Sequence, residues 1–131
     1  MKAIVLSCIF LASSLSAQTI ECPKFYPSED THLTETPYNH SGKGIVRRAE
    51  LKDASAFIGE INGGGELQGA RKDVKGGYDV ELPLNARWFV CEYGNDVQWW
   101  EELKLNPKIT SCTMQVRQSK KLPMDAKLVC K

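Results

Sequence analysis

The sequence has little histidine and no excess of either charge. Among 131 residues there are only two histidines, His32 and His40, and the formal net charge is +1. Nucleic-acid-binding proteins are usually strongly basic, so we expect no nucleic-acid partner. No G-x-S-x-G, H-E-x-x-H or Walker motif occurs, and both histidines lie in a segment interrupted by proline. We therefore expect that the protein is not an enzyme.

Closely spaced cysteine pairs of the C-x-x-C kind are also missing, which argues against a zinc site. Cys8 lies inside an N-terminal apolar run, and the other four cysteines are Cys22, Cys91, Cys112 and Cys130. An even number of cysteines in an exported chain is typical of a disulfide framework. The sequence predicts two disulfides, no metal and no cofactor.

The one long apolar run is at the N-terminus. Lys2 precedes small and apolar residues from Ala3 to Leu15, and Ser16-Ala17-Gln18 offers the small residues that signal peptidase requires. A membrane span needs about 20 apolar residues, so this run is too short to be an anchor. We expect a signal peptide over residues 1–17, cleavage near Ala17, and no membrane insertion afterwards.

No segment shows a sustained 3.6-residue apolar period, whereas alternation with a period of two recurs and predicts strands. The expected strands span residues 45–52, 55–61, 66–72, 78–84, 87–93, 97–103, 112–117 and 126–131. The predicted fold is mostly β, a small antiparallel sheet or sandwich. We expect a single domain over residues 18–131, with an irregular, proline-broken arm at 18–43 and a sheet core at 44–131.

The last two predicted strands allow a register to be proposed. If they form a hairpin across residues 120–122, Met114 faces Leu128, Val116 faces Ala126 and Cys112 faces Cys130. Opposed residues in an antiparallel pair are close enough for a disulfide. This register favours Cys112–Cys130 and leaves Cys22–Cys91, although four cysteines allow two other pairings.

Trp99 and Trp100 are the strongest candidates for partner binding. In a strand, neighbouring side chains point to opposite faces, so one indole should face the core and the other should face away. Tryptophan is favoured at protein interfaces. The plainer interpretation is that both rings are buried in a two-layer core. Glu101 and Glu102 follow, and with Glu92 and Asp96 they form an acidic group that suits a basic target or simple solvation.

The second candidate is a glycine-rich loop. Asn62, Gly63, Gly64, Gly65 and Glu66 interrupt the strand pattern, but no Lys-Ser/Thr follows to make a phosphate-binding loop. A flexible hairpin tip is the plainer interpretation. The functional one is a finger that enters the cleft of a partner.

Four segments resemble a family of small, disulfide-bonded periplasmic proteins of proteobacteria. They are Cys22-Pro23, the Trp-Phe-Val-Cys-Glu-Tyr run from Trp88 to Tyr93, Cys112 to Val116, and Leu128 to Cys130. Some members of that family are encoded in type VI secretion clusters beside toxins that attack the cell wall. The resemblance implies a periplasmic location, and the chain departs from it at residues 62–65, where the family has a Gly-Pro turn.

The leading hypothesis is therefore a periplasmic immunity protein that binds and blocks a cell-wall-targeting toxin delivered by type VI secretion. Its partner-binding residues would be Trp99, Trp100, Glu101, Glu102 and the loop Asn62–Glu66. The alternatives are an inhibitor of a host lysozyme or protease and an accessory envelope protein.

Overall fold

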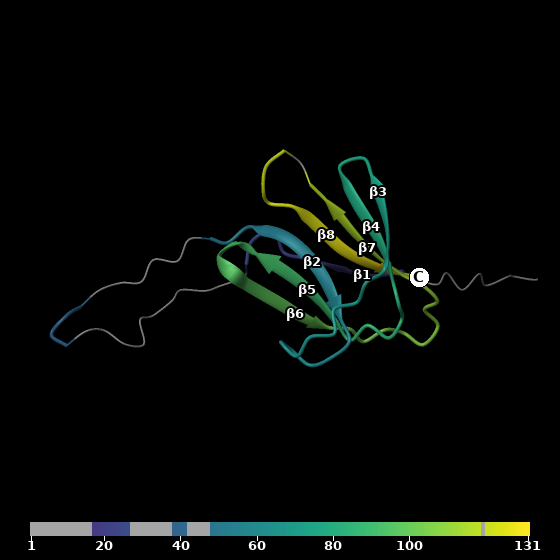
Figure 1. The fold of residues 1–131 in the computed structure, drawn as a ribbon, viewed down its shortest axis with the longest axis horizontal. Coiled ribbons are helices and arrows are strands. Elements are labelled where there is room, and N and C mark those ends of the chain that lie inside the picture. The colour runs from purple at the N-terminus through teal and green to yellow at the C-terminus, as the bar shows by residue number, and fades with distance from the viewer. Residues whose placement is uncertain (1–16, 27–37, 42–47, 119) are drawn as a thin grey trace, which may run out of the picture.

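Two antiparallel β-sheets face each other in this protein (Figure 1). The computed structural model describes residues 17–26, 38–41, 48–118 and 120–131. The five-stranded sheet has the order β1-β8-β7-β4-β3 and the three-stranded sheet the order β2-β5-β6. The strands are β1 (Gln18–Glu21), β2 (Leu51–Phe57), β3 (Ala70–Val74), β4 (Gly77–Leu82), β5 (Trp88–Tyr93), β6 (Val97–Glu102), β7 (Cys112–Arg117) and β8 (Asp125–Cys130). Within the described ranges the only helical element is a 3-10 turn, Gly94–Asp96, so the mostly-β prediction is confirmed.

Alternating apolar residues of the five-stranded sheet form one half of the core. In β7 and β8 every second residue is buried, as a half-buried strand requires. The observed register pairs Met114 with Leu128, Val116 with Ala126 and Cys112 with Cys130. The hairpin register predicted from the sequence is confirmed.

The three-stranded sheet supplies the other half. Phe89, Cys91 and Tyr93 are almost fully buried on the core-facing side of β5, opposite Ala56, Ala54 and Leu51 of β2. Their side chains join those of the five-stranded sheet in one hydrophobic cluster. The burial of both apolar faces against each other holds the two layers together.

Two disulfides link the strands, and both predicted pairings are confirmed. Cys112–Cys130 joins directly opposed residues of β7 and β8, with a Cα–Cα distance of 4.1 Å. Cys22–Cys91 joins the segment after β1 to the centre of β5, with a Cα–Cα distance of 5.8 Å. Only the second disulfide connects one sheet to the other.

The N-terminal segment differs from the irregular arm that was expected from residue 18 onward. Gln18–Glu21 forms a strand along β8, and Cys22 extends it by donating its N–H to the carbonyl oxygen of Ala126. The segment then crosses to the other sheet, where Tyr26 donates to Ala49 and Leu51 donates to Lys24. A four-residue strand is too short to be recognised without its partner, which explains the error. Residues 27–37 and 42–47 of the expected arm and first strand lie outside the described residues.

The strands between residues 45 and 72 also differ from the prediction. The two strands expected at 45–52 and 55–61 are replaced by the single strand β2, in which Ala54, Ser55 and Ala56 are all buried. Burial on both faces hides the period of two on which the prediction depended. Glu66 pairs back only to Phe57, and the following strand, β3, pairs with β4 instead.

We predict that the inter-sheet disulfide contributes more stability than the hairpin disulfide. The cysteines of Cys22–Cys91 are 69 positions apart and those of Cys112–Cys130 are 18 apart. Because loop entropy grows with loop length, replacing both cysteines by alanine should cost about 4 kcal/mol for the first pair and about 3 kcal/mol for the second. Urea denaturation of the two double variants measures this difference, and the reverse order would contradict it.

Candidate functional site

The outer face of the three-stranded sheet carries an aromatic cluster. Phe57 of β2 lies opposite Trp88 of β5, and Trp100 of β6 lies opposite Val90 of β5. The ring centroid of Trp100 is 4.8 Å from that of Phe57 and 6.2 Å from that of Trp88, which are favourable distances for ring contacts. Val90 is 0% exposed although it points away from the core, so side chains on this face exclude water from it.

Acidic residues occupy the rest of this face. Asp53 of β2 lies opposite Glu92 of β5, and Glu92 lies opposite Gln98 of β6. Glu66 flanks the aromatic cluster beside Phe57, and Glu102 flanks it beside Trp88. We call this surface the aromatic–acidic face; it consists of Asp53, Ser55, Phe57, Glu66, Trp88, Val90, Glu92, Gln98, Trp100 and Glu102.

The fold alters the titration of the Glu92 carboxyl group on this face. Burial raises its pKa above the ordinary value, and the negative charges of Asp53 and Glu66 add to the effect. The positive charge of Lys52 and the Ser55 hydroxyl, whose oxygen is 3.5 Å from the carboxylate, act in the opposite direction. Ionisation of the Glu92 carboxyl therefore lowers the free energy of unfolding.

The glycine loop begins where this face ends. Ile58 donates its N–H to Gly65, and Leu67 donates to Ala56, so the loop closes as a hairpin. Gly64 and Gly65 have φ angles of 84° and 85°, which favour glycine. The indole N–H of Trp88 donates to the carbonyl oxygen of Gly59 at 2.9 Å. This hydrogen bond ties the loop to the aromatic cluster.

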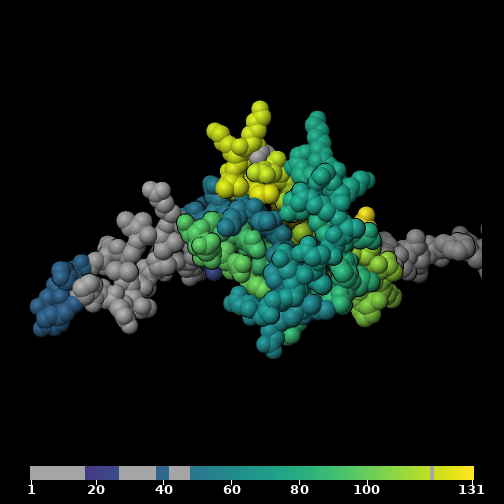
Figure 2. Space-filling view, viewed as in Figure 1, coloured from purple at the N-terminus to yellow at the C-terminus, as the bar shows by residue number. Residues whose placement is uncertain are grey.

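The predicted site residues are thus brought together only in part. Trp100 and Glu102 share the aromatic–acidic face with Glu66, and the loop residues Asn62–Gly65 lie at its end. Trp99 and Glu101 point to the other face of β6, where the Trp99 indole donates to the Glu101 carboxylate at 3.1 Å. In Figure 1 the loop after β2 lies beside the end of β6, and in Figure 2 its teal atoms adjoin the green atoms of β5 and β6.

The two tryptophans point to opposite faces, as expected for neighbours in a strand. Trp99 is 37% exposed, and Trp100 is half-buried in its ring contacts. The more exposed indole is therefore not the one at the centre of the cluster. Of the other predicted acids, Asp96 lies at the tip of the β5–β6 hairpin, 3.9 Å from the ammonium of Lys52.

Sequence reasoning missed Phe57, Trp88 and Asp53. The signal for Trp88 was present, because its segment is apolar at consecutive positions and therefore must be covered on both faces. Phe57 and Asp53 carried no comparable signal. Their place on this face follows from the β2–β5 register, which includes a bulge between Leu51 and Asp53.

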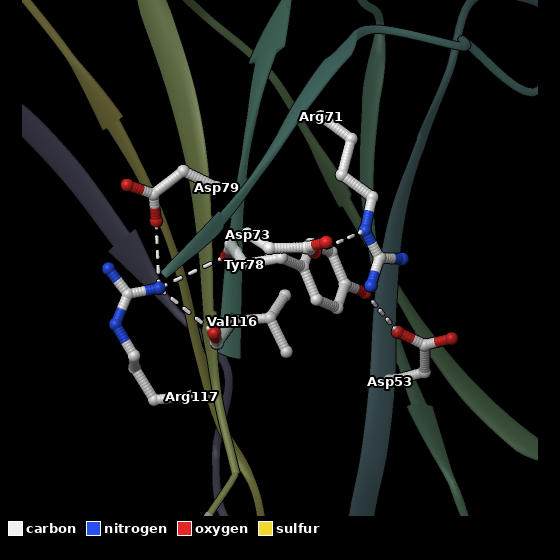
Figure 3. Close-up of polar contacts among 7 residues, drawn as sticks. All are labelled: Asp53, Arg71, Asp73, Tyr78, Asp79, Val116 and Arg117. Atoms are coloured by element: carbon white, nitrogen blue, oxygen red, sulfur yellow. Dashed lines mark hydrogen bonds and ion pairs between the residues drawn. The ribbon is translucent and has the colours of Figure 1, made fainter. Parts of the chain in front are cut away.

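A second group of polar contacts closes the side of the molecule next to β2 (Figure 3). The Tyr78 hydroxyl donates to Asp53 at 2.9 Å, and the guanidinium of Arg71 lies 3.9 Å from the centre of the Tyr78 ring. Burial and the Asp53 hydrogen bond raise the pKa of Tyr78 to about 12, so the hydroxyl keeps its proton at neutral pH. These contacts join β3 and β4 to the edge of β2.

Arg117 makes the other contact in Figure 3. Its Nη1 donates to the carbonyl oxygens of Tyr78 and Val116 and lies 2.7 Å from the Asp79 carboxylate. The guanidinium therefore neutralises Asp79 while it satisfies main-chain acceptors. This arrangement stabilises the sheet.

The groups available for chemistry in the described part of the chain are few. All four described cysteines are in disulfides, His40 is exposed, and His32 lies outside the described residues. Across residues 17–26, 38–41, 48–118 and 120–131, no three His, Cys, Asp or Glu side chains are grouped so as to hold a metal ion. The same ranges contain no helix long and apolar enough to span a membrane.

Comparison with known proteins adds no further assignment. No family model, curated protein or solved structure matches this chain.

We predict that Glu92 destabilises the folded state at neutral pH. Well below the ordinary pKa of 4.5 the carboxyl is protonated in both states, and as the pH rises the unfolded chain loses its proton first, so ionisation disfavours folding. Glu92→Gln should therefore be more stable than the wild type at pH 7, and the difference should shrink at pH 4. Urea denaturation at both pH values measures this.

The matched control is Glu102→Gln, which removes the same charge from an exposed position. Its stability relative to the wild type should change less between pH 4 and pH 7. An equal change in both variants would show that the effect is general to the charge of this face rather than specific to Glu92.

Proposed function

We propose that this protein is a periplasmic immunity protein that binds and blocks a cell-wall-targeting toxin delivered by type VI secretion. The observation that carries the proposal is the aromatic–acidic face, in which three aromatic rings lie side by side with the glycine loop attached at one end. The resemblance of the cysteine and aromatic segments to periplasmic proteins encoded beside such toxins supports the biological setting.

The aromatic cluster has the properties of a binding anchor. Its rings are held by contacts with each other, so they lose little conformational freedom when a partner covers them. Aromatic residues in such prearranged clusters dominate the binding energy of many protein interfaces. Arg87 lies over the Trp88 ring, with its guanidinium 5.3 Å from the ring centre, which further limits the motion of that indole.

The charge of the face suits the proposed target. Glu66, Glu92 and Glu102 border the rings, and carboxylates attract a basic surface and speed its association. Cationic groups in the substrate groove of a cell-wall enzyme would attract the carboxylates of the wall and, equally, the carboxylates of this face. The acidic border would therefore direct this protein toward that groove.

The hairpin that carries the glycine loop exposes two apolar side chains before that loop, Ile58 at its base and Ile61 next to Asn62. Ile58 is 41% exposed and Ile61 is 50% exposed, both in the segment held by the Trp88–Gly59 hydrogen bond. Exposed branched apolar side chains on a narrow loop gain burial when they enter a cleft. We assign this loop the role of filling the toxin's groove while the aromatic cluster anchors the complex.

Export completes the proposal. The N-terminal apolar run is the expected signal peptide, and two disulfides are typical of proteins that mature in an oxidising compartment such as the periplasm. A blocking protein needs no catalytic group of its own. It must only reach the compartment in which the toxin acts.

We predict that Trp100→Ala weakens toxin binding by about 2 kcal/mol or more, close to a 30-fold rise in Kd, because it removes the central ring of the cluster. Replacing Asn62–Gly65 by a two-residue turn should weaken binding as well. Isothermal calorimetry with the product of the neighbouring gene measures both effects, and urea denaturation establishes that each variant is folded.

The control is Leu122→Ala, which truncates an exposed apolar residue in the β7–β8 connection, outside the aromatic–acidic face and the glycine loop. Its affinity should remain within about twofold of the wild type. Unchanged affinity in both Trp100→Ala and the loop variant would remove the site assignment.

A rescue assay tests the function itself. The neighbouring gene product is exported to the periplasm with and without this protein, and cell lysis is scored. Rescue together with a stable complex supports immunity. Toxicity without rescue or binding counts against that toxin, and inhibition of a lysozyme or protease panel would then favour the alternative of a host-enzyme inhibitor.

A further inference from the structure

The outer edges of the two sheets are covered to different extents. The edge of β2 is covered by other segments: Leu67 donates to Ala56, Met124 donates to Leu51, and the Leu51 N–H itself donates to Lys24. The edge strand β3 exposes the charged residues Arg71–Asp73, and β1 is only four residues long. All three are common ways of preventing a further strand from pairing.

The edge of β6 lacks two of these protections, because no described segment covers it and it is longer than β1; its charged residues are Glu101 and Glu102, at its end. β6 has six residues, contains no proline or lysine, and pairs only with β5. Among the described residues no main-chain hydrogen bond reaches its outer side. An uncovered edge of this length is a template for another strand.

The β5–β6 ladder shows which groups point outward. Leu103 donates its N–H to Arg87 at 2.8 Å, so these two residues form a hydrogen-bonded pair. Such pairs alternate along an antiparallel ladder, which directs the main-chain groups of Val97, Trp99 and Glu101 toward β5. Those of Gln98, Trp100 and Glu102 therefore point to the open edge.

The charge along this edge is of one sign. Residues 88–103 contain four acidic residues and no lysine or arginine. Glu101 and Glu102 are consecutive and lie on opposite faces of β6. Because their side chains point in opposite directions, the two carboxylates cannot bind the same cation. Each would instead contact one of two consecutive residues of an incoming strand.

The two tryptophans extend this pattern. The Trp99 indole donates to Glu101, and the Trp100 indole donates to Gln98 at 2.9 Å, so both rings are held along the strand. One ring lies on each face of β6, next to the two glutamates. An incoming strand would therefore meet an acid and an aromatic ring on each of its faces.

We propose that the open edge of β6 binds an extended segment of the partner protein by antiparallel strand addition, and that this segment contains two consecutive Lys or Arg residues followed by two apolar residues. The proposal rests on the proposed function, because it states how the toxin is recognised at this site. Main-chain hydrogen bonds would supply the pairing, and the two acid–base contacts, one on each face, would set its register.

Two synthetic peptides test the pairing without the toxin. The probe is acetyl-Thr-Lys-Lys-Val-Val-Thr-amide, and the matched control is acetyl-Thr-Lys-Val-Lys-Val-Thr-amide, which has the same composition but both lysines on one face. Each is added to the ¹⁵N-labelled mature protein. Chemical shifts and amide hydrogen exchange are followed by NMR.

The expected result is an alternating pattern of protection. The probe should slow exchange at the amides of Gln98, Trp100 and Glu102 by at least about tenfold, because these groups become hydrogen-bonded. The amides of Trp99 and Glu101 should not change. The control peptide can form only one of the two ion pairs, so it should bind about two- to fivefold more weakly, which corresponds to the loss of one exposed ion pair.

Gln98→Pro and Gln98→Ala distinguish the contribution of the main-chain N–H at the edge from that of the Gln98 side chain. Proline removes the outward N–H but is tolerated at such an edge position, and the preceding residue, Val97, already has extended backbone angles. Gln98→Ala also loses the contact with the Trp100 indole but keeps the N–H. Probe binding should be lost in Gln98→Pro and retained in Gln98→Ala.

Three results would overturn the proposal. They are no shift with about 1 mM probe, equal binding of the two peptides, or protection that does not alternate along β6.

A dimer in sedimentation that Gln98→Pro dissociates would assign the edge to a second copy of this chain instead. If the peptides behave as expected but the rescue assay fails, the edge assignment stands and the toxin assignment falls. If rescue succeeds and the peptides fail, the toxin is bound without strand addition.

Discussion

The packing of both apolar sheet faces on one core, which the Cys22–Cys91 disulfide links covalently, is the constraint on which the rest of the structure depends. The N-terminal segment belongs to the five-stranded sheet up to Cys22 and then runs along the edge of β2, so the disulfide lies where the chain passes between layers. Beside it, the buried Tyr93 hydroxyl donates to the carbonyl oxygen of Pro23 at 2.7 Å. Burial raises the pKa of Tyr93 to about 12, so this donor keeps its proton. The link holds both sheets over one core.

The surface of the three-stranded sheet follows from that arrangement. Phe89 and Cys91 of β5 pack in the core, so Trp88 and Val90 lie on the opposite face of the strand. The side chains of Phe57 and Trp100 cover that face. The N-terminal segment, Leu67 and Met124 cover the edge of β2, so that among the described residues β6 is the open side of this sheet. The same packing therefore produces both the aromatic–acidic face and the free edge at which we propose that a partner strand binds.

The accuracy of the sequence predictions depended on how local the signal was. The Cys112–Cys130 pairing was correct because strict alternation over two nearby segments allows one register in which apolar residues oppose each other. The arm at 18–43 was described wrongly at its start, since Gln18–Glu21 becomes a strand only through pairing with the distant β8. β2 was divided in two because burial on both of its faces removes the alternation.

The candidate site shows the same division between local and distant signals. Trp100, Glu102 and the glycine loop were found from the sequence, whereas Phe57, Trp88 and Asp53 were not. The sequence by itself determined the fold class and the opposite orientation of Trp99 and Trp100, because a period of two assigns each side chain to a face. It favoured the observed disulfide pairs over the two other pairings. Only the tertiary structure decided which residues share the aromatic–acidic face and which edge stays open, because both depend on registers and segment crossings between residues far apart in the chain.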